Sequence, residues 1–168
     1  MLSVKRFSFG IFGIVLSSSS VSYIAPSLSI ALKMIGFSPD HVGLTFCIPA
    51  LLYIVTCLLT PLITQKLPKR LVIAIGFHIL AVAMFMIGSD GSFIRVNPGH
   101  IILAGLFFLG VAAAMIVTPI TPEQQEAIEQ QNKFNYDPED FATFLSSLFL
   151  SCTAIGETIG PFASSILN

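Results

Sequence analysis

The stretch IILAGLFFLGVAAAMIVTP, residues 101–119, contains no charged side chain and a single hydroxyl group. An α-helix needs about 20 mostly apolar residues to cross the hydrocarbon core of a lipid bilayer, and this stretch meets that requirement. Four further apolar stretches lie on either side of it, at about residues 7–32, 42–64, 71–89 and 141–167. The sequence therefore predicts an all-α integral membrane protein, with five transmembrane helices in a single transmembrane domain, residues 1–168.

The composition also excludes a soluble globular protein. Hydrophobic residues make up 54% of the chain and charged residues only 10%, whereas a typical soluble domain is about 25% charged. The mean hydropathy is +0.87. A closed β-barrel would alternate apolar and polar residues in segments of about ten, but these stretches are continuously apolar. Helices, which satisfy their own backbone hydrogen bonds, are therefore expected.

The first apolar stretch has the features of a retained helix rather than those of a cleaved signal peptide. Lys5 and Arg6 could form a basic leader, but the apolar run that follows is too long, and Pro26 lies where a cleavage site would be sought. The cysteines all lie inside apolar stretches, at Cys47, Cys57 and Cys152. We therefore expect no disulfide framework.

The distribution of cations predicts the orientation of the chain, because cytoplasmic loops retain an excess of Lys and Arg. With the N-terminus in the cytosol, the inner segments contain Lys5, Arg6, Lys66, Lys69, Arg70 and Lys133. The outer segments then contain Lys33 and Arg95. This ratio of six to two places the N-terminus in the cytosol, and the odd number of helices places the C-terminus on the other side of the membrane.

Prolines preceded by small polar residues mark the beginnings of helices. Ser38-Pro39-Asp40 combines an N-cap, a proline and a first-turn carboxylate. The fourth and fifth helices open in the same way, at Asn97-Pro98 and Asp137-Pro138. Thr121-Pro122-Glu123-Gln124 resembles a capping box and predicts a short surface helix. Because residues 121–140 carry six carboxylates and the single cation Lys133, we expect this segment to be an acidic cytoplasmic loop.

Polar residues gather on one face of each of the first two helices. At about 100° per residue, one face of the first helix combines Ser18, Ser22, Ala25 and Ser29. One sector of the second combines Thr45, Tyr53, Thr56 and Thr60. In lipid, such faces must contact another helix or water. Two interpretations remain open: helix packing through small residues and hydroxyl groups, and a solute cavity lined by Ser18, Ser22, Ser29 and Tyr53.

The fifth stretch contains a seam of small residues, Thr153, Gly156, Gly160 and Ser164, in which Pro161 directly follows Gly160. Repeated spacing of this kind lets two helices approach closely. We therefore expect helix packing at Gly156, Gly160, Pro161 and Ser164.

Glu157 lies beside this seam and is the only carboxylate within the five predicted spans. A charge in the middle of a bilayer is costly and is rarely kept without a partner or a task. Because a carboxyl group removed from water tends to be protonated, Glu157 could couple solute movement to protons. The alternative is a neutral acid bonded to a backbone carbonyl group.

The remaining polar residues do not indicate an enzyme. His78 lies among apolar residues and is expected to be a neutral, hydrogen-bonded packing residue. No zincin, serine-hydrolase, Walker or dinucleotide-binding pattern occurs in the sequence. We expect no catalytic residue, no cofactor, no metal site and no nucleic-acid partner.

Two motifs resemble those of a known transporter family. Pro61-x-x-x-Gln65-Lys66-x-Pro68-Lys69-Arg70 resembles the major facilitator superfamily loop motif Gly-x-x-x-Asp-basic-x-Gly-basic-basic. Its three cations match, and Pro61, Gln65 and Pro68 replace Gly, Asp and Gly. Gly156-Glu157-x-x-Gly160-Pro161 is similar to the Gly-x-x-x-Gly-Pro segment in the fifth helix of a half-transporter. With Pro119-x-x-Pro122-Glu123, these motifs are most similar to the second half of vesicular amine, polyamine and drug:proton antiporter relatives.

The resemblance implies helices seven to eleven of a twelve-helix secondary active transporter, which moves small organic solutes by alternating access and is coupled to protons. The first and fourth helices would then line the solute cavity, the second and fifth would flank it, and the third would lie outside. Glu157 would carry the coupling proton. The cytoplasmic loop latch would consist of Gln65, Lys66, Lys69 and Arg70.

A transporter of this plan needs two six-helix halves around a midplane site. We therefore expect the chain to be a fragment whose partner in the lipid bilayer is the missing half-transporter or another copy of the chain. The seam of the fifth helix would then face lipid in the isolated chain, which should not transport alone. The alternative is a non-transporting membrane scaffold or assembly subunit.

Overall fold

The computed structural model describes residues 2–34, 36, 38–88, 98–129 and 138–167. In these residues the secondary structure is helical, and the helices are α1 (Leu2–Met34), α2 (Pro39–Lys66), α3 (Lys69–Gly88), α4 (Pro98–Glu129) and α5 (Pro138–Leu167). All five are long and apolar enough to cross a membrane. The prediction of an all-helical protein with five helices of membrane-spanning length is confirmed, and this fits a multi-pass membrane protein.

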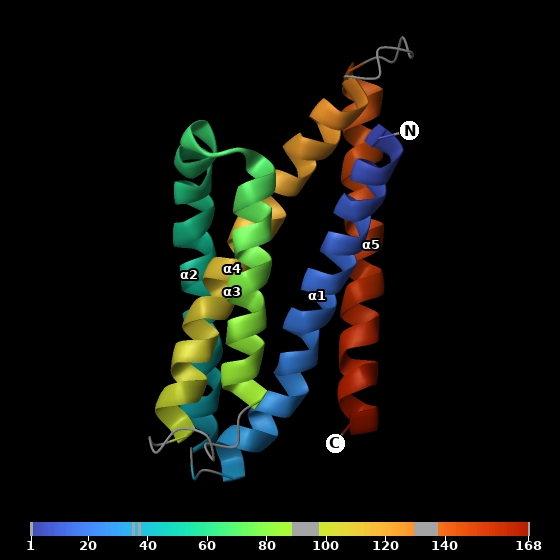
Figure 1. Cartoon of the computed structure of the whole chain (residues 1–168). Coiled ribbons are helices and arrows are strands. Elements are labelled where there is room, and N and C mark those ends of the chain that lie inside the picture. Colours follow the sequence, from blue (N-terminus) through green and yellow to red (C-terminus); the bar gives the residue numbers. More distant parts are fainter. Residues whose placement is uncertain (1, 35, 37, 89–97, 130–137, 168) are drawn as a thin grey trace.

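The helices run alternately up and down (Figure 1). The N-terminus and the short connection between α2 and α3 lie at one end of the bundle, and the C-terminus lies at the other. Adjacent helices in the sequence are therefore antiparallel, as successive crossings of one bilayer require.

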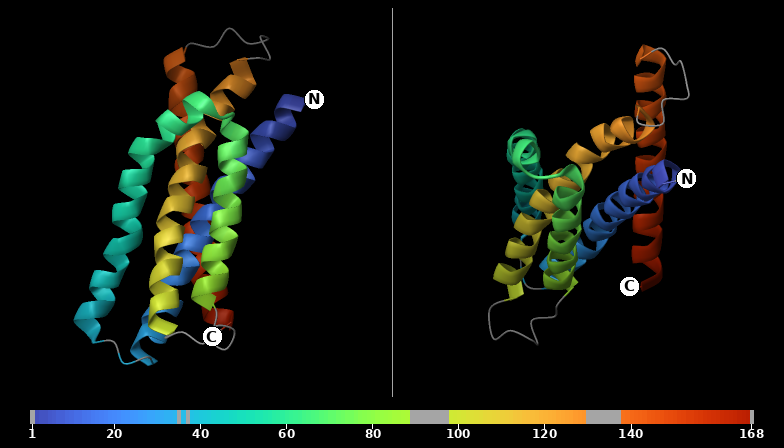
Figure 2. Two further views of the ribbon diagram at one scale, coloured as in Figure 1. Left: turned by 60° about the vertical axis from the view of Figure 1, so that its left-hand side comes forward. Right: turned by 45° about the horizontal axis from the view of Figure 1, so that its top comes forward.

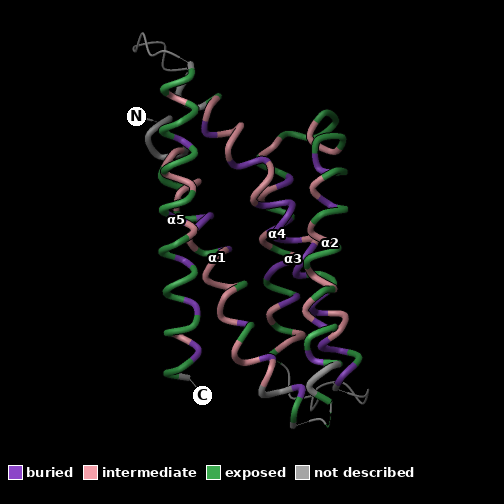
Figure 3. Tube along the Cα trace, turned by 180° about the vertical axis from the view of Figure 1, so that it is seen from behind, coloured by how far each residue is buried: buried purple, intermediate pink, exposed green. Residues whose placement is uncertain are grey.

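Helix α4 is the centre of the bundle. In the most apolar 18 residues of α4, 61% of the residues are buried. The corresponding stretches of the other four helices are 17–22% buried. It packs against α1, α2 and α3, whereas α5 packs on α1. Figure 2 shows α1 between α5 and the other helices, and Figure 3 shows that most of α5 is exposed. The stretch at residues 101–119 thus belongs to the helix around which the others assemble.

The core consists of aliphatic side chains that recur on the inward faces of α1 and α4. Its buried members include Ile14, Leu28, Leu106, Leu109 and Ile116. Large apolar side chains on the outer faces are exposed instead, among them Leu58, Phe85 and Phe162. Exposed apolar side chains of this size suit contact with lipid tails, which are as apolar as the side chains themselves.

Glycines allow the central helix to approach its neighbours closely. A Cβ atom on Gly76 of α3 would lie 2.8 Å from Cγ1 of Ile116, and one on Gly110 of α4 would overlap the backbone carbonyl group of Pro49 in α2. Close packing of backbones through small residues is a main source of helix association in membranes. The α2–α4 and α3–α4 pairs both depend on it.

The predicted helix beginnings at Pro39, Pro98 and Pro138 are confirmed. The end of α4 differs from the prediction, because the helix continues through Pro119 and Pro122 to Glu129. The separate surface helix expected from Thr121 is therefore wrong, as is the loop expected over residues 121–129. Residues 130–137 of that segment lie outside the described residues.

Tertiary contacts explain why the prolines do not end α4. Pro119, Ile120 and Gln124 are buried, and the end of α4 leans toward α1 and α5 (Figure 1). Proline removes one backbone hydrogen bond and favours a bend. The burial of the segment that follows offsets this loss, which a reading of local sequence cannot detect.

Candidate solute cavity

A cavity of about 560 Å³ lies between α1, α2, α4 and α5. Ser18 and Tyr53, on its wall, lie at the centres of the candidate spans Phe7–Ser29 and His41–Lys66. The cavity is therefore at mid-depth in the bundle. Among the described residues, α3 contributes nothing to its lining.

Two closely packed helix pairs form the walls of this cavity. A Cβ atom on Gly156 would lie 2.6 Å from Cβ of Ser18, so α5 rests directly on α1. On the other side, Gly110 of α4 rests on the backbone of Pro49 in α2. Helix α1 also contacts α4, whereas α5 packs mainly on α1. The two pairs therefore face each other, and the cavity lies between them.

The wall of the cavity is mostly apolar and carries a few polar groups. It brings together Ser18 and Ser22 of α1, Tyr53 of α2 and Glu157 of α5, all of which were predicted as site residues. Ser29 is not part of the lining, and its hydroxyl group donates a 2.9 Å hydrogen bond to the carbonyl oxygen of Pro26. Ser17, which is buried, also lines the cavity and was not predicted. An apolar cavity with few polar groups is typical of small-molecule sites.

The cavity opens to the surface of the bundle beside Glu157. Glu157 is exposed, and so are the lining residues Val21 and Ile54, at 41% and 58%. A carboxyl group that faced lipid tails would be costly. This opening must therefore face water or another protein when the chain is in a membrane.

The small-residue seam of α5 does not face lipid, so that expectation is wrong. A Cβ atom on Gly160 would lie 2.6 Å from the carbonyl oxygen of Ser19, and the hydroxyl groups of Ser164 and Ser27 are 2.8 Å apart. The complement to the seam is the serine-rich face of α1, within the same chain. Pro161 lies on the exposed side of α5.

A second polar face of α5 was missed in the sequence analysis. It lies roughly 140° around the helix from the seam and is exposed at Thr143, Ser147, Ser151, Thr158 and Ser165. Each of these hydroxyl groups donates a hydrogen bond to a backbone carbonyl group of α5 itself. Their spacing of four and seven residues could have revealed this face. Glu157 lies between the seam and this face, so polar groups of α5 continue beyond the opening of the cavity.

Some polar residues of α2 line the cavity, and others serve helix packing. Tyr53 lines the cavity, but Thr45, Thr56 and Thr60 are buried. The hydroxyl groups of Thr45 and Thr60 donate to the carbonyl oxygens of His41 and Thr56. For these threonines the packing interpretation therefore holds.

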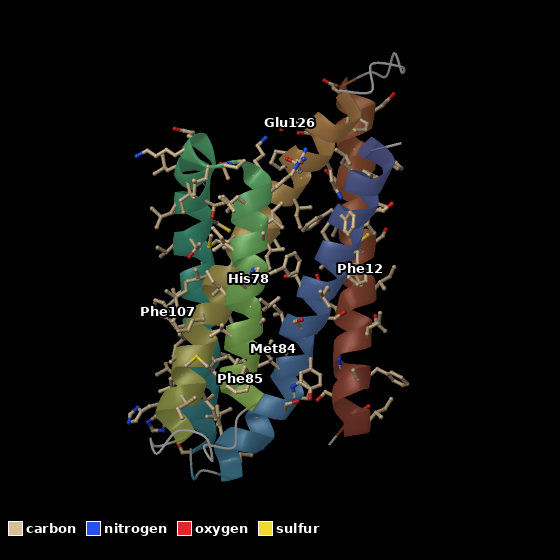
Figure 4. All side chains as sticks on the ribbon, in the orientation of Figure 1. Phe12, His78, Met84, Phe85, Phe107 and Glu126 are labelled. Carbon is tan, nitrogen blue, oxygen red and sulfur yellow. The ribbon has the colours of Figure 1, made fainter. Side chains whose placement is uncertain are left out.

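The basic loop between α2 and α3 is joined to the end of α4 by two ion pairs. The Lys69 ammonium group pairs with Glu126, and Nε of Arg70 lies 2.6 Å from Oε1 of Glu123. Glu126 lies at this end of the bundle, beside the start of α3 (Figure 4). Gln65 and Lys66 are exposed. The carboxylates that were expected in a loop thus hold the α2–α3 connection to the central helix.

His78 is hydrogen-bonded, as predicted, but it is not packed in the core. Its side chain is exposed on α3, and Nδ1 lies 2.8 Å from the carbonyl oxygen of Ala74. Within the described residues, no group of three or more His, Cys, Asp or Glu side chains could hold a metal ion.

Comparisons with protein families, curated proteins and solved structures found no match to this chain.

Proposed function

We propose that the chain is the solute-binding part of a secondary active transporter that moves small organic solutes by alternating access, coupled to protons. The observation that supports this most is the mid-depth cavity, in which Ser18, Ser22, Tyr53 and Glu157 meet although they come from three helices. Solute sites near the middle of the bilayer, between helices that can move relative to each other, are typical of such transporters.

Each polar group has a role in this proposal. The hydroxyl groups of Ser18, Ser22 and Tyr53 would bind polar groups of the solute. Glu157 would alternate between a protonated and an ionised state, because a carboxyl group at the opening of the cavity can exchange protons with water and attract a cationic solute. The apolar remainder of the wall would surround the hydrocarbon part of the solute.

The ion pairs at the end of the bundle would latch its cytoplasmic side. Lys69 and Arg70 on α3 hold Glu126 and Glu123 on α4. Movement of α3 relative to α4 would break these pairs, and ion pairs that are partly exposed, as these are, cost little to break. They can therefore stabilise one state of a transporter without locking it.

Membership of the major facilitator superfamily is part of the proposal. It rests on the loop motif at residues 61–70 and on Gly156-Glu157-x-x-Gly160-Pro161. It implies the first and fourth helices at the cavity, the second and fifth beside it and the third outside. The lining includes residues of α1 and α4 and, within the described residues, none of α3, but it also includes residues of α2 such as Phe46 and Pro49. A cover over the exposed opening, supplied by another half-transporter or a second copy of the chain, would complete the site.

The orientation gives a direct test of this assignment. In a background without native cysteines, Leu67→Cys and Gln130→Cys should react with a membrane-impermeant thiol reagent only from the cytosolic side. Phe93→Cys should react only from the opposite side. The reason is the six-to-two distribution of cations across the membrane. Labelling of Leu67→Cys from outside would contradict both the orientation and the cytoplasmic latch.

The proposed activity can be tested with proton-loaded vesicles. Membrane vesicles from cells that produce the chain together with its partners should accumulate a radiolabelled amine or polyamine when a pH gradient is imposed, and a protonophore should abolish the accumulation. Liposomes containing only the purified chain should show uptake no higher than empty liposomes, because the opening beside Glu157 is not covered. Saturable uptake by the isolated monomer would contradict the need for a cover. If neither preparation responds to the pH gradient, the scaffold alternative is favoured.

A further inference from the structure

A second cavity, of about 350 Å³, lies at the end of the bundle that carries the ion pairs. Helices α1, α3 and α4 form it, with Phe9, Phe77 and Ile120 on its apolar wall and Arg70, Glu123 and Gln124 at its polar end. Phe9 and Arg70 lie near the beginnings of their candidate spans, and Gln124 lies near the end of its span. This cavity is therefore at the level where lipid headgroups meet the hydrocarbon core.

Gln124, which lines this cavity, carries a buried hydrogen-bond donor without a partner among the described residues. Its residue is only 3% exposed, and its Nε2 atom has no hydrogen-bond partner among the described residues. Gly10 of α1 makes room for the amide group, since a Cβ atom there would lie 2.5 Å from Nε2. Buried donors in folded proteins nearly always have an acceptor. The ligand of this cavity should supply one.

Arg70 provides further donors at the same place. Its Nε atom donates to Glu123 at 2.6 Å, whereas a guanidinium group has five N–H donors in all. The Arg70 side chain is 57% exposed, so a ligand can reach its outer edge. Arg70 and the neighbouring Lys69 are each paired with a carboxylate. The site therefore offers hydrogen-bond donors rather than net positive charge.

We propose that this cavity binds a membrane phospholipid, independently of any transport function. The phosphate group would accept hydrogen bonds from the free edge of Arg70 and, once the buried amide group turns into the cavity, from Nε2 of Gln124. One acyl chain would lie along Phe9, Phe77 and Ile120. A lipid fits better than free phosphate because the wall is apolar and Phe9, at 76% exposure, opens it toward the surrounding bilayer.

The chain contains no tryptophan, so one introduced tryptophan can report lipid contact. Phe9→Trp places the reporter at the mouth of the cavity, and Phe162→Trp on the exposed face of α5 reports bulk lipid. In mixed micelles, acyl-brominated phosphatidylglycerol should quench the fluorescence of both tryptophans. The mole fraction that halves the fluorescence should be about tenfold lower for Phe9→Trp than for Phe162→Trp, because hydrogen bonds to a charged group contribute about that factor. Acyl-brominated diacylglycerol, which lacks the phosphate, should quench both alike.

Paired variants test the role of the amide group. In the Phe9→Trp background, Gln124→Met should raise the half-quenching mole fraction about tenfold, whereas Gln125→Met, one residue away and outside the cavity, should leave it unchanged. Equal effects of the two variants, or equal quenching of both reporters by the phospholipid, would overturn the proposal. Protection of Phe9→Trp by millimolar inorganic phosphate would instead indicate a small-anion site and overturn the lipid assignment. If Gln124→Met does not fold, the comparison of phospholipid with diacylglycerol decides.

Discussion

Replacing Glu157 with glutamine is expected to abolish proton-driven accumulation of solute while leaving the helices folded. Glutamine keeps the shape of the side chain but cannot release or take up a proton in the physiological range. Under the proposed mechanism, accumulation in vesicles with an imposed pH gradient should fall at least tenfold, to the level seen with a protonophore. Exchange of labelled for unlabelled solute across the same vesicles, which needs no net proton movement, should be reduced much less.

Glu139→Gln is the matched control, because it removes an exposed carboxylate from the first turn of the same helix. It lies outside the cavity lining and should leave accumulation within about twofold of that of the unmodified protein, since exposed charges at a helix start contribute little. If Glu157→Gln and Glu139→Gln behave alike, the carboxyl group of Glu157 is structural. The cavity would then need a different coupling group.

Adding a single methyl group at Gly160 is expected to weaken the attachment of α5 to the bundle. In Gly160→Ala, the new Cβ atom would lie 2.6 Å from the carbonyl oxygen of Ser19 and 2.7 Å from the backbone nitrogen of Tyr23. Backbone atoms cannot move aside as a flexible side chain can, so α5 must shift away from α1. Overpacking of this kind costs about 1–3 kcal/mol, and Gly156→Ala should add a similar loss. The free energy of unfolding can be measured by SDS titration in mixed micelles.

Gly43→Ala and Gly88→Ala separate this steric effect from the effect of alanine on the helix itself. A Cβ atom at either position meets no other atom within 4 Å. Alanine is the better helix former by about 1 kcal/mol, so these variants should be neutral or stabilising. A loss of stability in them equal to that in Gly160→Ala would show that close packing is not what holds α5.

The candidate site was predictable where it depends on the periodicity of one helix. Ser18, Ser22 and Tyr53 lie on the polar faces that the spacing of residues indicated, and all three line the cavity. Ser29 lies on the same face as Ser18 but more than two turns farther along α1, and it is not part of the lining. A polar face can extend along a whole helix, whereas the cavity extends along only part of it. The polar face of α5 could also have been found from its spacing.

The packing of Gln124, Glu123 and Glu126 could not be predicted. The sequence predicted a short surface helix within an acidic loop, because a capping box and six carboxylates occur at residues 121–140. In the structure all three residues belong to α4 and contact α1 or α3. Their partners Gly10, Arg70 and Lys69 are more than 50 residues away in the chain. Which distant residues meet depends on how the helices pack, and helix propensity carries no information about it.

The sequence by itself determined that five segments form helices of membrane-spanning length, because length and continuous apolarity decide this one helix at a time. It also determined where most of those helices begin, since caps and prolines act on the neighbouring turn alone. Only the tertiary structure decided that α4 is central, that the seam of α5 is covered by the serines of α1, and that five polar residues, Ser17 among them, share one cavity. Each of these features depends on contacts between different helices. Whether one face of a helix is buried or exposed is decided only when the neighbouring helix packs against it.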